Sequence, residues 1–300
     1  PMNPCGISGI EFVEFSSKQP EKLRKLFCEF GFARTKRHES KKIDFYLQND
    51  IHFLINTEPN SFASSFTETH GPCISAMGWR VENAERAFME ALKRGARACP
   101  APDYARGSQN IPAIYGIGES LIYFIENNTN TEALYADLGF KKIPDADPVQ
   151  DKGFIAIDHL TNNVPSGTMK QWSDFYKNIF GFTEIRYFDI RGAQTGLTSF
   201  ALKSPDGSFC IPINEGTEAK SQINEYLREY KGAGIQHLAF LTKNILHSLK
   251  KLEGTSIETL DMDDEYYAEV FQRVKQVRED KDLIKKYNVL ADGTDDGYLL

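Results

Sequence analysis

The stretch GFIAIDHLTNNVPSG, residues 153–167, determines how the rest of the sequence is interpreted. Four apolar residues, 154–157, lead directly into Asp158 and His159, and a polar segment containing Pro165 follows. A short apolar run bounded by turn-forming residues predicts a buried strand. A histidine at the end of such a strand is either a core residue with a hydrogen-bond partner or a metal ligand, and the remaining sequence has to decide between them.

Composition narrows the class of protein. The chain has 300 residues, of which 41% are hydrophobic and 26% are charged, a profile typical of a globular protein of about two domains. The net charge of -7 argues against nucleic acid or an anionic membrane as the main partner, because both favour a basic face. Five scattered cysteines without a C-x-x-C pair predict no disulfide framework and a reducing, cytoplasmic location. We expect neither a signal peptide nor a membrane span.

An order of elements found in the first half recurs in the second. In the first half, strands and amphipathic helices alternate by their apolar periodicity, with strands predicted at 9–15, 42–50, 51–58, 74–81 and 120–128 and helices at 18–32 and 83–96. In the second half, the corresponding strands are 154–160, 198–205, 208–215 and 234–241, and the helices are 167–182, 221–232 and 244–254. Such self-similarity indicates an internal duplication.

The repeat predicts the fold class and its division. We predict an α+β protein of two domains, each built from paired βαβββ modules that form a curved, barrel-like mixed sheet. The Asp- and Pro-rich segment at 141–152 is a plausible linker, so that residues 1–140 and 153–300 form the two domains.

Comparison of the two halves singles out two histidines. Aligning GIEF with AIDH places Phe12 where His159 lies, and aligning ISAMGWRV with IQHLAFLT places Ala76 where His237 lies. A histidine after an apolar run is more often structural than functional. Two that occur together in only one half favour a shared role, and we interpret them as metal ligands. Neutral imidazole suits iron, zinc, copper and nickel, and two His with one carboxylate are typical of non-haem Fe(II) oxygenases.

Strand geometry predicts the direction of both side chains. Alternate residues of a strand share a face, so His159 is expected beside Ile157, and His237 beside Ile235, both pointing inward from a curved sheet. A buried imidazole without a partner is costly, and a metal would satisfy it. The other histidines, His38, His52, His70 and His247, are weaker candidates. The acidic segment 260–267 lacks the glycine and spacing of an EF-hand and is interpreted as a solvated turn.

Longer motifs resemble the 4-hydroxyphenylpyruvate dioxygenase family of the vicinal oxygen chelate superfamily. The similar segments cover nearly the whole chain and include GIEFVEF, NSFASSF, HGPCISAMGWRVENAERA, NIPAIYGIG, IDHLTNNV, GLTSFALKSPDG, IPINE, GAGIQHLAFLT and DDEYY. The resemblance implies that His159 and His237 are iron ligands and that no catalytic residue is needed beyond the ligands of the metal. It also implies a substrate pocket lined by Ser199, Asn214, Gln222 and Gln236. Gln236 would point away from His237 in a regular strand, so its role requires a local bulge.

The resemblance also implies an activity. The family uses Fe(II) and O2 to convert 4-hydroxyphenylpyruvate to homogentisate and CO2 in tyrosine and phenylalanine catabolism, and its members form dimers or tetramers. Its third ligand, a glutamate, would lie beyond Leu300, so we expect the 300-residue chain itself to be inactive and metal-free or loosely metallated, unless Glu215 or Glu265 completes the site. The alternatives are a 4-hydroxymandelate synthase, an extradiol dioxygenase, which the IPINE and GAGIQHLAF segments disfavour, or a metal-free binding or assembly module.

Overall fold

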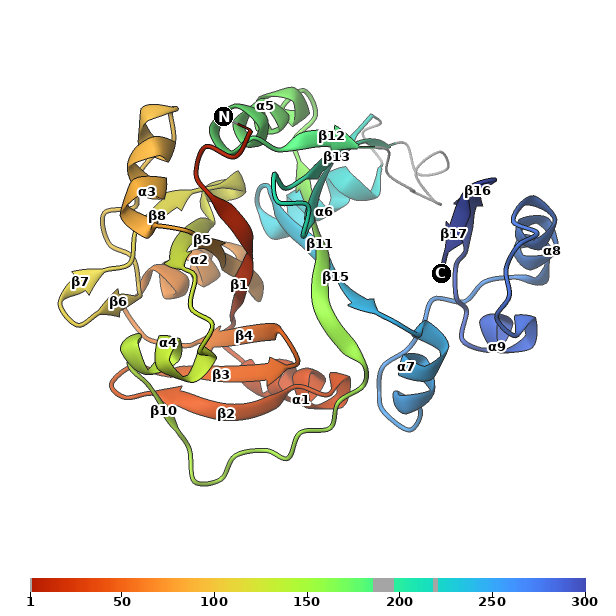
Figure 1. Ribbon diagram of the computed structural model, residues 1–300, viewed down its shortest axis with the longest axis horizontal. Coiled ribbons are helices and arrows are strands. Elements are labelled where there is room, and N and C mark those ends of the chain that lie inside the picture. The colour runs from red at the N-terminus through yellow and green to blue at the C-terminus, as the bar shows by residue number, and fades with distance from the viewer. Residues whose placement is uncertain (1, 186–196, 218–220) are drawn as a thin grey trace.

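The first half forms a curved mixed sheet (Figure 1) in the computed structural model, which describes residues 2–185, 197–217 and 221–300. Its strand order is β10-β2-β3-β4-β1-β5-β9-β8, with β1 parallel to β4 and antiparallel to β5. Side chains from β3 and from β9 meet in one buried cluster, so the sheet curves around an apolar interior. The elements are β1 (Ile7–Ser16), α1 (Pro20–Phe30), β2 (Ala33–His38), β3 (Ile43–Gln48), β4 (Ile51–Asn56), α2 (Phe62–His70), β5 (Cys73–Val81), α3 (Ala84–Lys93), β6 (Ala105–Arg106), β7 (Gln109–Asn110), β8 (Ala113–Tyr115), β9 (Leu121–Glu126), α4 (Thr131–Asp137) and β10 (Phe140–Lys142).

The second half repeats the first module and begins the next. Its sheet has the order β12-β13-β14-β11-β15, in which β11 is parallel to β14 and antiparallel to β15, as β1 is to β4 and β5. Among the described strands, β15 pairs with β11 alone. The elements are β11 (Phe154–Val164), α5 (Met169–Phe180), β12 (Thr183–Ile185), β13 (Leu197–Lys203), β14 (Cys210–Gly216), α6 (Gln222–Tyr230), β15 (Gly234–Thr242) and α7 (Ile245–Lys251).

A third, smaller unit follows α7. Helices α8 (Asp264–Arg273) and α9 (Lys281–Lys286) and the hairpin of β16 (Asp292–Thr294) and β17 (Gly297–Leu299) share a small core, which lies apart from the two sheets in Figure 1. The acidic segment predicted as a turn instead begins α8, because the Asp263 side chain accepts a hydrogen bond from the Tyr266 N–H as its N-cap.

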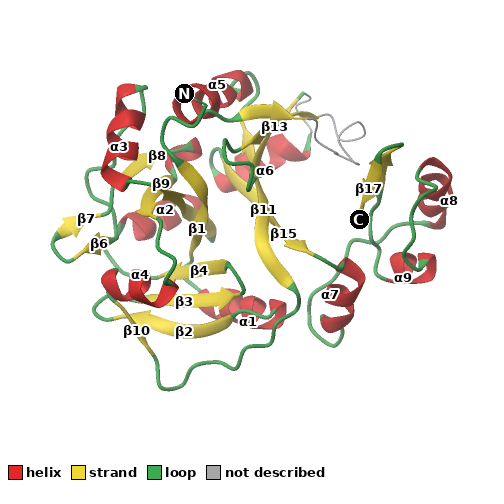
Figure 2. Cartoon of the chain, in the orientation of Figure 1, coloured by secondary structure: helices red, strands yellow, loops and turns green. Residues whose placement is uncertain are grey.

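The two sheets share one large core. The apolar cluster includes Val13 and Trp79 from the first half and Leu160 and Ile211 from the second, so the helix-covered faces of the sheets are packed together. Figure 2 shows the strands of both halves in yellow, with α2 and α6 drawn among them and α3 and α5 toward the top of the view. The concave face of each sheet takes no part in this shared core. In the first half, the concave face encloses a second apolar cluster that contains Phe12 and Ala76.

The predicted fold class is confirmed, since the duplicated modules and mixed sheets are those of a two-domain α+β protein. The helix boundaries predicted for α1 also agree with the structure. Pro20 lies in its first turn, and Gly31 ends it in the left-handed conformation at φ 100°. Residues 141 and 142, assigned to the linker, complete β10 and pair with β2. The division into domains at 140 and 153 stays a prediction. No helix within the described ranges is long and apolar enough to cross a membrane.

Candidate metal centre

His159 and His237 lie on neighbouring antiparallel strands. His159 on β11 is opposite Ala239, and His237 on β15 is opposite Thr161, so the two histidines are diagonal neighbours. Their ring centroids are 5.7 Å apart, and their planes are inclined by 81°. Because metal–nitrogen bonds are about 2.0–2.1 Å long, two rings at this separation can share one ion. The structure thus brings together the two residues that the comparison of the halves selected.

The register of the strands supports the alignment of the halves. In the first half, Phe12 is opposite Gly78 and Ala76 is opposite Glu14. The second half repeats this register with His159 in the place of Phe12 and His237 in the place of Ala76. Phe12 and Ala76 are buried, at 0% and 1% exposure, in the interior cluster of the first sheet. The two imidazoles therefore occupy positions that serve only packing in the other half.

The predicted neighbours of the histidines are wrong. Ile157 and Ile235 belong to the core shared with the helices, as does Leu160, so they lie on the face opposite to the histidines. The cause is a pair of irregularities in register. Ile157 is opposite Phe240, yet His159 is opposite Ala239, so one extra residue is inserted on β11. Such a β-bulge reverses the alternation of side chains between faces.

The predicted burial of the histidines is also wrong. The His159 side chain is 18% exposed, and His237 is exposed. The reason is the position of β15 as the outermost strand of its sheet among the described residues, which leaves the concave face open. A cavity of about 800 Å³ lies against His159, bordered by Ala239, Glu279 and Tyr298. His159 thus faces an accessible cavity, and His237 borders a separate one of about 420 Å³ beside Phe240, so neither imidazole is enclosed in a core.

Each imidazole has its Nδ1 atom bound to the side chain of the preceding residue. Nδ1 of His159 is 2.8 Å from Oδ2 of Asp158, and Nδ1 of His237 is hydrogen-bonded to Oε1 of Gln236. A carboxylate or amide oxygen can only accept, so both rings carry their proton on Nδ1 and present the lone pair of Nε2. This is the usual arrangement of metal-binding histidines. The donor set therefore fits a divalent transition metal.

Ser199 and Asn214 face the same side of the sheet as the histidines. Leu202, Ile211 and Ile213 point into the shared core, so the alternate residues of β13 and β14 point to the concave face. Ser199 and Asn214 are directly opposite each other, and the Ser199 hydroxyl donates to Oδ1 of Asn214. Asn214 is also opposite Asn163 of β11, four residues beyond His159 and thus about 13 Å along that strand.

Two polar residues of β11 were missed in the sequence. Oγ1 of Thr161 and Oδ1 of Asn163 are buried and, among the described residues, have no hydrogen-bond partner. Both alternate with His159 along the strand, so they share its face. A buried acceptor without a donor is costly and marks a place where a polar ligand can bind. The alternation of His159, Thr161 and Asn163 is the signal by which the sequence could have revealed them.

Other candidates lie elsewhere. Gln222 is exposed in the first turn of α6. Oε2 of Glu215 accepts hydrogen bonds from the backbone N–H groups of Gly167 and Met169 at the start of α5, and Glu265 is exposed on α8. Across residues 2–185, 197–217 and 221–300, no group of three or more His, Cys, Asp or Glu is placed to hold a metal ion. His52, one of the weaker candidates from the sequence, is buried and hydrogen-bonded to Glu11.

Comparisons with known proteins agree with this architecture. Residues 2–141 match the family model "Hydroxyphenylpyruvate dioxygenase, HPPD, N-terminal", and residues 156–280 match "Glyoxalase/Bleomycin resistance protein/Dioxygenase superfamily". The chain is 54% identical to Protein MelA of Shewanella colwelliana over 99% of its length and 85% of that protein. It is 41% identical to 4-hydroxyphenylpyruvate dioxygenase of Pseudomonas aeruginosa over 99% of its length and 84% of that protein.

A solved structure supports the fold alone. A mutant of 4-hydroxymandelate synthase from Streptomyces coelicolor superposes with a TM-score of 0.79 at 19% identity, over 98% of this chain and 87% of that one. Fold, paired imidazoles and family matches together define an enzyme of the glyoxalase–dioxygenase superfamily with the vicinal oxygen chelate fold. Within it, the chain belongs to the 4-hydroxyphenylpyruvate dioxygenase family, which makes it an oxidoreductase.

Proposed function

We propose that this protein converts 4-hydroxyphenylpyruvate and O2 to homogentisate and CO2 with Fe(II) held by His159 and His237. The observation that carries the proposal is the pair of imidazoles with centroids 5.7 Å apart, present only in the second half of a chain that is 41% identical to a curated 4-hydroxyphenylpyruvate dioxygenase. Bound Fe(II) supplies the binding and activation of O2 and of the 2-oxo acid.

The protein would contribute orientation of the substrate. The polar groups of Thr161, Asn163, Ser199 and Asn214 share the concave face with the histidines, so a molecule that reaches the metal also meets them. Because Oδ1 of Asn214 accepts from Ser199, its amide N–H groups are directed to donate to substrate oxygen atoms. The unsatisfied oxygens of Thr161 and Asn163 are suited to accept from a phenolic hydroxyl.

Two substrate contacts that the resemblance implied have less support. Gln236 is engaged by His237, and Gln222 is exposed at the start of α6. We keep both as predictions, with Ser199 and Asn214 as the stronger pair. We further propose that the protein acts in the cytoplasm as a dimer or tetramer, as the family resemblance implies. Size-exclusion chromatography with light scattering would test the oligomeric state.

The deciding experiment is a product assay. Protein that includes the glutamate expected beyond Leu300 is purified, loaded anaerobically with Fe(II) and supplied with 4-hydroxyphenylpyruvate and O2, and its products are separated by chromatography and identified by mass. We expect homogentisate and CO2 in equal amounts, with one O2 consumed for each. Formation of 4-hydroxymandelate would assign the alternative activity, for which the structural likeness at 19% identity supports only the fold. Iron bound without any turnover would remove the proposed reaction.

A further inference from the structure

Both halves of the molecule have irregularities of register at three equivalent places, and two of these lie next to the positions of the histidines. In the second half, the extra residues are Asp158 on β11, between Ile157 and His159, and Gln236 on β15, between Ile235 and His237. In the first half, the register between β1 and β5 shifts around Glu11 and around Ser75. Glu11 precedes Phe12, the equivalent of His159, and Ser75 precedes Ala76, the equivalent of His237. The bulges therefore belong to the duplicated module itself and are independent of metal binding.

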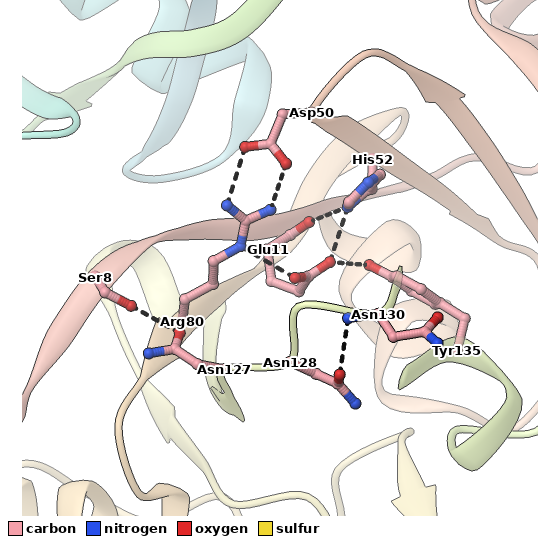
Figure 3. A network of polar contacts seen from close by, with 9 residues as sticks. All are labelled: Ser8, Glu11, Asp50, His52, Arg80, Asn127, Asn128, Asn130 and Tyr135. Carbon is pink, nitrogen blue, oxygen red and sulfur yellow. Dashed lines mark hydrogen bonds and ion pairs between the residues drawn. The ribbon is translucent and has the colours of Figure 1, made fainter. Parts of the chain in front are cut away.

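In the first half, each bulge directs a polar side chain into a network. The Glu11 carboxylate accepts from Nδ1 of His52 at 2.8 Å, from the Tyr135 hydroxyl at 2.8 Å and from Nε of Arg80 at 3.1 Å, in the network drawn in Figure 3. Arg80 is held in turn by both oxygens of Asp50 at 3.0 Å. Burial opposes ionisation, but the hydrogen bond and charge of His52, with the charge of Arg80, hold the pKa of Glu11 below its usual value.

The second bulge of the first half likewise places a polar side chain, that of Ser75, in a hydrogen bond. The Ser75 hydroxyl donates to Oε1 of Glu14 at 2.5 Å, on the strand opposite. In both places the extra residue precedes a position on the concave face, and its polar side chain contacts a residue of another strand or helix. In a regular strand, consecutive residues point to opposite faces, so the bulge changes where these side chains can reach.

In the second half, the same two bulges bring Asp158 to His159 and Gln236 to His237. The partner of each imidazole is its own predecessor in sequence, a contact that the bulge permits. We propose that Asp158 and Gln236 are positioning residues: each fixes the Nδ1–H tautomer and the ring orientation of the following histidine, so that Nε2 is directed toward a metal ion. This inference rests on the proposed function, because it assigns a purpose to the two imidazoles as ligands.

Asp158 and Gln236 differ in charge, so we expect them to affect their imidazoles differently. A carboxylate on Nδ1 raises the basicity of the imidazole as a ligand, whereas an amide only orients it. The side chain of Asp158 is 52% exposed and that of His159 18%, so substitutions here do not disturb the apolar core. We infer that Asp158 contributes both orientation and charge, and that Gln236 contributes orientation alone.

The test reads the tautomers of the metal-free protein. Histidine-specific ¹⁵N labelling and long-range ¹H–¹⁵N correlation above pH ~8, where imidazoles are neutral, report which ring nitrogen carries the proton. We expect Nδ1–H for both rings of the wild type. Asp158→Ala should move His159 toward the Nε2–H tautomer and leave His237 unchanged, and Gln236→Ala should do the reverse. Asp174→Ala, which removes an exposed carboxylate paired with Lys170 on α5, is the control.

Affinity for Co²⁺, measured by calorimetry, is the second readout. Each alanine variant should bind about 10- to 100-fold more weakly than the wild type. The conservative variants separate charge from orientation: Asp158→Asn should keep the tautomer and bind slightly more weakly, and Gln236→Glu should keep the tautomer and bind more tightly.

Three results would overturn the proposal. They are wild-type rings in the Nε2–H tautomer, tautomers that the alanine variants leave unchanged, and conservative variants that change affinity in the opposite directions. If an alanine variant did not fold, the wild-type tautomers and the conservative variants would still decide. Failure of the proposed function would give a different result, because turnover would be absent although the tautomers of the wild type and the variants were as expected.

Discussion

Trp79 and Phe240 occupy equivalent positions in the two halves, and each packs against a helix of the opposite half. The indole ring of Trp79 on β5 lies 4.9 Å from the ring of Phe180 on α5, and the ring of Phe240 on β15 lies 5.8 Å from that of Phe30 on α1. Trp79 is fully buried, whereas Phe240 is half-buried beside a cavity of about 420 Å³. The reciprocal packing joins the halves through their shared core.

Truncation of these two rings should have unequal effects. Trp79→Ala should lower the free energy of unfolding by about 3–5 kcal/mol, because it removes a large side chain from a filled core. Phe240→Ala should cost roughly half as much, since part of its surface is already exposed. Urea unfolding followed by circular dichroism measures both, with Met89→Ala, 58% exposed on α3, as the control. Equal losses would contradict this account of the packing.

The stability of the first half should depend on the protonation of Glu14. Burial and the neighbouring charge of Asp103 raise the pKa of this fully buried carboxyl group from 4.5 to about 7, against hydrogen bonds from Ser75, Tyr104 and Asn56. Between these values the folded protein binds more protons than the unfolded chain, so this contribution is present below pH 4.5 and is lost as the pH rises through 7.

Glu14→Gln tests that sign. The amide cannot ionise, so the variant should gain stability relative to the wild type as the pH rises, by roughly 2–3 kcal/mol between pH 4 and 8. Chemical unfolding at several pH values measures the difference, with Glu269→Gln, an exposed position on α8, as the control. A difference independent of pH would mean that the pKa of Glu14 is the same in the folded and the unfolded chain.

The two histidines should be indispensable to the proposed reaction. We expect His159→Ala and His237→Ala each to abolish homogentisate formation and to lower the amount of bound Fe(II), because each removes a ligand of the metal. His247→Ala, at an exposed position on α7, should change neither. Iron content by mass spectrometry and product by chromatography are the measurements. A histidine variant that kept its iron and its rate would remove that residue from the ligand set.

Asn214 should affect the substrate and not the metal. Asn214→Ala removes the amide that donates toward the concave face, and the loss of one hydrogen bond should raise KM about 5- to 50-fold, with iron content unchanged. Ser199→Ala should have a smaller effect in the same direction, since the hydroxyl acts through Asn214. Steady-state kinetics compare both with Asn128→Ala, a remote exposed position. Loss of iron in Asn214→Ala would argue against this role.

Sequence periodicity predicted the repeated elements but not the helix α2. Its segment, Phe62 to His70, has only a weak apolar pattern, and its start is held by Asp103, whose carboxylate accepts hydrogen bonds from the N–H groups of Phe62 and Ala63. That partner lies about 40 residues away in the chain, so no local pattern reveals it. The helices α1, α3, α5, α6 and α7, in contrast, have an apolar periodicity of their own and were predicted, whereas the short capped helices α4 and α8 were missed.

The candidate site was predictable in its residues and not in its geometry. Comparing the halves identified His159 and His237, and the condition that Gln236 requires a bulge to lie beside His237 is met. The predicted face and burial of the histidines were wrong. A bulge arises from the register between two strands, so the sequence of either strand alone does not reveal it.

The shared bulges also bear on how the two halves diverged. A backbone irregularity found at the same two positions in both halves was in place before they diverged from a common module. Exchanging Phe12-like and Ala76-like side chains for imidazoles, or the reverse, then needed no remodelling of the main chain. Substitutions at two positions that already followed a bulged residue would then suffice to give one half with paired imidazoles and one half with a packed interior.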